Sequence, residues 1–193
     1  SDFLYHLGFG TADNLPEKFG DVRYVIMGGS NTRMELMAYY LQAKLQKNLS
    51  RPTDLAIKGG RYSLYKVGPC ICVNHNIGAS TLSVVLHEIS KLIYHAGIPA
   101  ELVHFIRLGT SGGIGVEPGT VVIATGACDS LKRTDFHTTA CGKVMTMPMV
   151  LDNNKAQEIH QIAKKLKIKS ELGKTMGTDD FYLAQGTAFQ NAL

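Results

Sequence analysis

The sequence contains no tryptophan, no long apolar run and no cluster of basic residues interleaved with aromatic ones. A membrane-spanning helix needs about 20 consecutive apolar residues, and no segment reaches that length. The net charge is only +4, which does not indicate a nucleic-acid groove, although small anions would be tolerated. The first ten residues lack the basic-then-apolar order of a signal peptide. These absences predict a cytoplasmic protein without a nucleic-acid or membrane partner.

Cysteine is also scarce, and its spacing forms no disulfide framework. The four cysteines are Cys70, Cys72, Cys128 and Cys141. Cys70 and Cys72 lie in an apolar run whose alternate side chains share one face, which predicts buried, reduced thiols of an intracellular protein. A Cys-x-Cys metal site is the alternative, but no Cys/His pair at ligand spacing lies nearby. No metal site is therefore expected.

The composition, with 45% hydrophobic and 19% charged residues, is that of an ordinary globular protein. Together with the length it predicts one globular domain over residues 1–193. Strand patterns alternate with helical ones, and glycine turns follow the strands, which predicts an α/β fold with a mixed sheet and helices on both faces. The stretch 127–148 reads as loop with short strands. Strands are expected at 22–27, 62–67, 70–74, 103–108 and 120–124, and helices at 34–45, 81–95 and 153–167.

A glycine-rich loop between two predicted strands, within 103–124, has the composition of an anion site. Thr110 and Ser111 supply hydroxyl groups, and Arg107 offers a planar fork for two oxygens of one anion. Close backbone approach is permitted by Gly109, Gly112, Gly113 and Gly115. The alternative is a plain glycine turn with a solvated Arg107, since glycine motifs match many loops.

A second glycine turn, GGSNTR at 28–33, joins a predicted strand to a helix. This arrangement presents backbone N–H groups and the positive end of the helix dipole to an anion. Arg33 is unfavourable beside that dipole end unless an anion binds there. The turn is neither the dinucleotide motif nor a P-loop. Arg61 lies in a comparable setting, at the start of the strand expected at 62–67.

Together these stretches resemble the nucleoside phosphorylase-I family, and most closely its animal-type uridine phosphorylases. The resemblance follows family order over nearly the whole chain. The segments that carry it are YHLGF (5–9), VIMGGSNTRM (25–34), GRYSLYKVGP (60–69), the stretch 76–89, IRLGTSGGIGVEPGTVVI (106–123) and TDDFYLAQG (178–186).

The resemblance implies a three-layer α/β/α sandwich and the phosphorolysis of uridine to uracil and ribose 1-phosphate, a step of pyrimidine salvage. The reaction requires no cofactor, because phosphate is a co-substrate. The resemblance also implies a homodimer or hexamer whose active sites are shared between subunits. Anionic phosphate is a suitable nucleophile for the oxocarbenium-like transition state at C1′.

The resemblance also assigns residues to the phosphate. Four come from the subunit that contains the site, and Arg107 and Thr110 among them would be catalytic. The fifth, Arg61, would reach in from the neighbouring subunit. The phosphate residues are Gly29, Arg33, Arg61, Arg107 and Thr110.

A second set would hold the nucleoside. His6 of the neighbouring subunit would contact the ribose 5′-hydroxyl, and Thr110 would lie beside the ribose. The uracil would be met by Gly112, Phe181 and Gln185.

The sequence departs from the family pattern at three points. Asn76 occupies the first glycine position of a Gly-Ile/Met-Gly turn, where its side chain would crowd the ribose, although Asn tolerates a left-handed backbone. Thr187 stands where an arginine recognises a pyrimidine oxygen. The sequence stops at Leu193, before the Met-Glu motif that binds the ribose hydroxyls. We therefore expect an incomplete ribose site here. The sequence is either part of a longer polypeptide or that of a degenerate paralogue, and we favour the first explanation.

Two other functions remain open from the sequence. A nucleosidase that uses water is possible, but it has little need of the three arginines Arg33, Arg61 and Arg107. A paralogue without activity, which binds nucleoside or serves as an oligomer partner, is motivated by Asn76 and Thr187.

Overall fold

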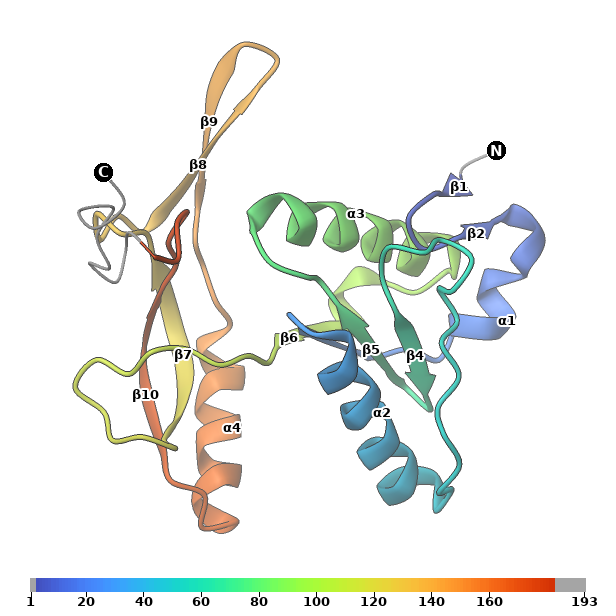
Figure 1. Cartoon of the computed structure of the whole chain (residues 1–193), viewed down its shortest axis with the longest axis horizontal. Helices are drawn as coiled ribbons and strands as arrows, with labels where there is room; N and C mark the ends of the chain where they lie inside the picture. Colours follow the sequence, from blue (N-terminus) through green and yellow to red (C-terminus); the bar gives the residue numbers. More distant parts are fainter. Residues whose placement is uncertain (1–2, 183–193) are drawn as a thin grey trace. The chain divides into compact units, whose positions relative to one another are not determined.

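The computed structural model describes residues 3–182 (Figure 1). The chain divides into two compact units, residues 1–111 and 112–193, and each is described by itself. The expectation of a single domain over 1–193 stays a prediction. No helix within the described residues is both long and apolar enough to cross a membrane.

The first unit is built on a four-stranded sheet in the order β4-β5-β3-β6. Strand β3 is parallel to both β5 and β6, whereas β4 is antiparallel to β5. The predicted mixed sheet is confirmed. The strands are β3 (Tyr24–Gly28), β4 (Leu64–Val67), β5 (Cys70–Asn74) and β6 (His104–Arg107).

Two helices cover opposite faces of this sheet. Alternate strand residues point to opposite sides, so each face packs against its own helix. On one face Val25 packs in the same core cluster as Ile89 of α3 (Ala79–His95). On the other face Cys72 packs with Met34 of α2 (Asn31–Gln46). The predicted α/β/α sandwich is confirmed.

The cysteines of β5 behave as the sequence predicts. Cys70 and Cys72 are both buried and free. Burial raises the pKa of the Cys72 thiol to about 12, so this thiol is protonated at neutral pH.

Short elements around the N-terminus complete the core on the α3 side. A hairpin of β1 (Phe3–Leu4) and β2 (Phe9–Gly10) precedes a 3₁₀ turn, η1 (Thr11–Asp13), and α1 (Leu15–Phe19). A second 3₁₀ turn, η2 (Ala100–Leu102), leads into β6. The turn of the N-terminal hairpin carries His6, so this small structure decides where that side chain lies.

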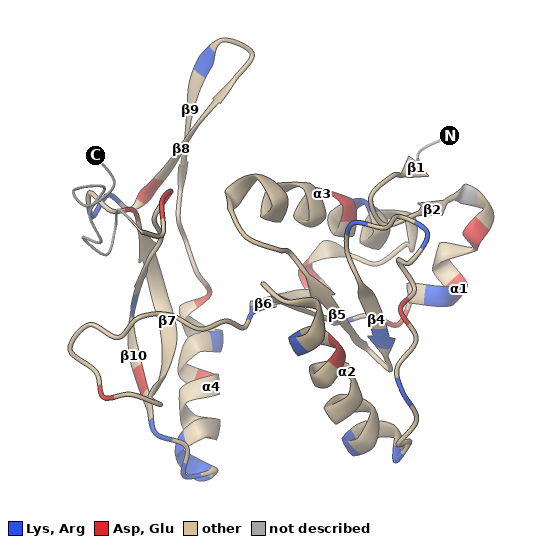
Figure 2. Cartoon of the chain, viewed as in Figure 1, with Lys and Arg blue, Asp and Glu red and all other residues tan. Residues whose placement is uncertain are grey.

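The second unit contains a parallel pair, β7 (Val121–Cys128) and β10 (Ser170–Met176), packed against α4 (Asn153–Lys165). The Asp152 side chain caps α4 by accepting a hydrogen bond from the backbone N–H of Lys155, 3.0 Å away. Lysines at the C-terminal end of α4 are exposed, as expected of a solvated helix end (Figure 2).

The stretch 127–148 is more regular than the sequence indicates. It forms an antiparallel hairpin of β8 (Asp135–Ala140) and β9 (Lys143–Pro148), each six residues long. Every residue of β9 is exposed in this chain. A strand without a buried face needs no alternation of apolar and polar residues, so the sequence marks it poorly.

Candidate functional site

Three parallel strands of the first unit end at the same edge of the sheet. Gly28 at the end of β3 pairs with Asn74 of β5, and Met27 pairs with Arg107 of β6. The backbone N–H of His75 donates to the carbonyl of Gly28 at 2.8 Å, which keeps the segment after β5 beside the end of β3. This carboxyl edge is where open α/β sheets bind ligands.

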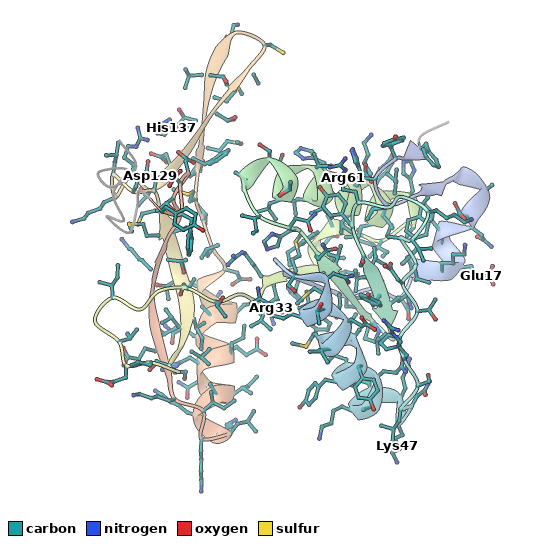
Figure 3. All side chains as sticks on the ribbon, viewed as in Figure 1. Glu17, Arg33, Lys47, Arg61, Asp129 and His137 are labelled. Carbon is teal, nitrogen blue, oxygen red and sulfur yellow. The ribbon has the colours of Figure 1, made fainter. Side chains whose placement is uncertain are left out.

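The turn after β3 is packed closely against the segment that follows β5. A β-carbon built at Gly29 would lie 3.4 Å from the Asn76 carbonyl oxygen and 3.7 Å from Cε1 of His75. The helix α2 begins directly after Ser30, whose side chain makes no capping hydrogen bond. Free backbone N–H groups at a helix start suit an anion. Arg33 lies exposed in the first turn of α2 (Figure 3).

Arg107 is the last residue of β6, and its side chain folds back over the glycine loop. A β-carbon at Gly109 would lie 3.0 Å from Nη1 of Arg107, so a side chain there would displace the guanidinium. Arg107 and Thr110 are both exposed. The glycine therefore lets an exposed arginine fork lie against the backbone that leads to Thr110.

His75 lies beside these groups, and no role was predicted for it from the sequence. It is only 6% exposed, and neither ring nitrogen has a hydrogen-bond partner of normal geometry in the described part of the chain. Burial lowers the pKa of His75, and the positive charge of Arg107 lowers it further. The backbone of Asn76 and that of His75 itself oppose this shift of the pKa, and Arg33 adds the smallest lowering effect. The ring is therefore neutral at pH 7. Its place directly after a buried strand is the sequence signal that could have marked it.

Gly29, Arg33 and Arg107, all assigned to phosphate, thus lie around one neutral histidine at the carboxyl edge. We call this set, with Thr110, the edge group. It joins glycine backbone, a helix start, two exposed guanidinium groups and a hydroxyl. Such donors suit an anion with several oxygens.

A second set, His6 and Arg61, comes from loops of the same unit, and we call it the loop group. The ring of His6 lies 6.3 Å from the ring of Tyr62, measured between centroids, in an edge-on arrangement. A side chain at Gly59 would collide with the carbonyl oxygen of His6, so the two loops touch backbone to backbone. Arg61 is exposed and directly precedes Tyr62 (Figure 3).

Asn76 links the two sets. Its φ of 57° is left-handed, the conformation expected of an asparagine in a glycine position. Its Nδ2 donates to the carbonyl oxygen of Arg61 at 3.3 Å, and its Oδ1 accepts from Asn74 at 2.7 Å. The side chain expected to crowd the ribose is thus hydrogen-bonded to the backbone of a loop-group residue.

The residues predicted to meet uracil lie only partly within the described residues. Gly112 begins the second unit and is exposed. Phe181 follows β10, is 69% exposed and packs edge-on against Tyr182. Gln185 and Thr187 lie outside the described residues. These base contacts stay predictions.

Metal ligands are not gathered in the described residues: no three His, Cys, Asp or Glu side chains lie close enough together to hold an ion. The expectation that the site works without metal or cofactor stays a prediction. The available chemistry at the carboxyl edge is binding and orientation of an anion by fixed donors.

The sequence matches the phosphorylase superfamily over residues 23–192. It is 39% identical over 189 residues to uridine phosphorylase 2 of Homo sapiens, and the alignment covers 96% of this chain and 59% of that protein. It is 36% identical over 186 residues to inactive uridine phosphorylase B of Schistosoma mansoni, covering 94% of this chain and 61% of that protein. The chain therefore spans less than two thirds of the length of these relatives.

A solved structure shows the same fold. The uridine phosphorylase of Schistosoma mansoni in complex with uracil matches this chain with a TM-score of 0.89 at 34% identity, covering 96% of this chain and 64% of that one. The resemblance drawn from the sequence segments is confirmed. Since the match extends over most of its residues, the chain belongs to the phosphorylase superfamily.

Proposed function

We propose that the protein carrying this chain catalyses the phosphorolysis of pyrimidine nucleosides, converting uridine and phosphate to uracil and ribose 1-phosphate in cytoplasmic pyrimidine salvage. The observation that carries the proposal is the edge group, in which Arg33 and Arg107 lie around the neutral His75 beside Gly29. A relative that is 39% identical is named uridine phosphorylase 2, which supports the choice of substrate.

In this reaction one phosphate oxygen forms a bond to C1′ as the bond from C1′ to the uracil nitrogen breaks. The bonding pair leaves with the base, which then takes up a proton. Arg107 and Arg33 hold phosphate by charge-assisted hydrogen bonds, and Thr110 adds a hydroxyl donor. Held in line, the anion attacks without a metal or an organic cofactor, and it stabilises the cationic sugar as it does so. A base donor such as the Gln185 amide stabilises the departing uracil.

The loop group completes the site of a neighbouring subunit in the same proposal. His6 contacts the ribose 5′-hydroxyl and Arg61 the phosphate, so the protein works as a homodimer or a hexamer built from dimers. The contacts between the two loops support this assignment, because His6 and Arg61 come from loops that touch, beside the ring of Tyr62. A two-fold interface would present both to the partner together.

The test is uracil release from uridine by the full-length protein, measured with and without phosphate. Phosphate-dependent release, with ribose 1-phosphate as the second product, is expected. Release at the same rate without phosphate would show a hydrolase instead. For substitutions of the edge-group arginines, such as Arg107→Ala, the matched control is Arg51→Ala. Arg51 is an exposed arginine that pairs with Glu35 and lies outside the edge and loop groups.

A second candidate function is nucleoside binding by an inactive paralogue. Asn76 in a glycine position favours it, as does a 36% identical relative that is named inactive. Calorimetric binding of uridine without turnover would support this candidate. If the two departures are the cause, Asn76→Gly and Thr187→Arg raise the rate of uracil release; an unchanged rate excludes that explanation.

A further inference from the structure

The carboxylate of Glu88, on α3, accepts hydrogen bonds from the turn that carries His6. Its Oε1 lies 2.6 Å from Nδ1 of His6 and 3.0 Å from the backbone nitrogen of that residue. Its Oε2 accepts from the backbone N–H groups of His6 and Leu7, at 3.1 Å and 2.9 Å. The Glu88 side chain is 13% exposed and that of His6 30%. One carboxylate thus fixes both the backbone and the ring of a residue more than 80 positions away in the chain.

This contact decides which nitrogen of His6 carries the proton. An ionised carboxylate has only acceptor oxygens, so Nδ1 must donate to it. In the neutral ring Nε2 then has a free lone pair and can only accept a hydrogen bond. A hydroxyl group that meets Nε2 must therefore donate.

We propose that Glu88 is a positioning residue for nucleoside recognition: it holds His6 in the Nδ1-protonated form so that Nε2 accepts the hydrogen bond of the ribose 5′-hydroxyl. The inference rests on the proposed function, because it takes the ligand of His6 to be a nucleoside. It adds a selectivity element for nucleosides that bear a free 5′-hydroxyl group. A neutral amide at position 88 would offer one acceptor in place of two and would present its NH₂ to one of the present donors.

The test compares uridine with 5′-deoxyuridine, which lacks that hydroxyl, in the full-length protein. The hydrogen bond from the ribose hydroxyl to Nε2 joins two neutral groups, so its loss in Glu88→Gln is expected to lower kcat/KM for uridine by about three- to tenfold. The same variant should change kcat/KM for 5′-deoxyuridine by less than about twofold, because that substrate never uses Nε2. An equal loss with both substrates would overturn the proposal and leave Glu88 a purely structural residue.

Two variants separate positioning from general damage. Glu101→Gln makes the same chemical change at an exposed glutamate of the same unit and is expected to leave both substrates unaffected. In a His6→Ala background, Glu88→Gln should produce no further loss with uridine, because Glu88 acts through His6. A full second loss in that background would contradict the proposal.

A readout without catalysis keeps the inference separate from the proposed reaction. The ¹⁵N chemical shifts of the His6 ring report which nitrogen is protonated. The wild type should show the Nδ1-protonated form near pH 8, and Glu88→Gln should shift the ring toward the other tautomer. An Nε2-protonated ring in the wild type would overturn the inference. Absence of uracil release together with the expected tautomer would refute the reaction and leave the Glu88–His6 geometry standing.

Discussion

The edge group and the loop group belong to the same unit but are held in different ways. Gly29 and Arg107 take their positions from the ends of paired strands, where backbone hydrogen bonds and register leave little freedom. His6 and Arg61 lie in loops that are tied to the rest of the unit by single polar side chains, those of Glu88 and Asn76. One half of the proposed site is therefore set by the sheet, and the other by a few side-chain contacts that reach across the unit.

The largest expected effect is at Arg107, the fork of the edge group. Arg107→Ala should lower kcat/KM for phosphate about 10²–10³-fold, as for loss of a fixed donor to reacting charge. Arg107→Lys should recover only part of it, because an ammonium cannot bind two oxygens side by side. The measurement is the initial rate of uracil release at saturating uridine over a range of phosphate concentrations. An unchanged phosphate dependence would remove Arg107 from the site.

Substitution of Asn76, which links the two groups, should change the free energy of unfolding. Its left-handed backbone costs an ordinary residue about 1–2 kcal/mol, so Asn76→Ala should lower the free energy of unfolding by about that amount. Asn76→Gly should cost less, since glycine adopts that conformation freely. Urea unfolding of the three proteins tests this order. Equal stability of the wild type and the alanine variant would contradict it.

Tyr62 lies beside the loop group, with its ring edge-on to the ring of His6. Its hydroxyl donates to the backbone carbonyl of Thr81 at 2.8 Å, and its side chain is 3% exposed. Tyr62→Phe should lower the free energy of unfolding by about 1 kcal/mol, because it removes that hydrogen bond. Tyr94→Phe, at a tyrosine that is 77% exposed, should change it by less than about 0.5 kcal/mol. Similar values for both variants would show that the Tyr62 hydroxyl contributes nothing.

The smallest effect is a pH dependence at the centre of the edge group. Burial holds the folded-state pKa of His75 below its ordinary value of 6.5, so the unfolded chain binds more protons at lower pH. Stability from this residue is complete above pH 6.5 and is lost as the pH falls toward the folded-state pKa, with a slope of at most about 1.4 kcal/mol per pH unit. His75→Gln should therefore have a flatter stability profile between pH 7.5 and 5.5. Identical slopes would contradict the burial argument.

The edge group was predictable because its residues follow strands that the sequence marks clearly. The strand expected at 70–74 coincides with β5, whose apolar run is bounded by a Gly-Pro turn. Once three parallel strands are placed, their carboxyl ends meet, and the residues after them are neighbours. The proximity of Gly29, Arg33 and Arg107 follows from this argument, whereas their assignment to phosphate came from the resemblance and stays a prediction.

The supports of the loop group were not predictable in the same way. In the sequence, Glu88 looks no different from a solvent-facing glutamate of an amphipathic helix. Its partner His6 is more than 80 residues away in the chain. The strands β1 and β2 are two residues each, too short for a periodic signal. The hairpin of β8 and β9 carries no buried face in this chain, so only its turn residues mark it. Long-range polar contacts need coordinates, because no local pattern records them.

The most direct test of the two-part site is subunit complementation between Arg61→Ala and Arg107→Ala proteins. In a mixed dimer one site regains both arginines and the other loses both, so a 1:1 mixture of freely exchanging subunits should recover about a quarter of wild-type activity while each variant alone stays nearly inactive. A mixture no more active than its separate components would contradict a site completed by the loop group of the neighbouring subunit.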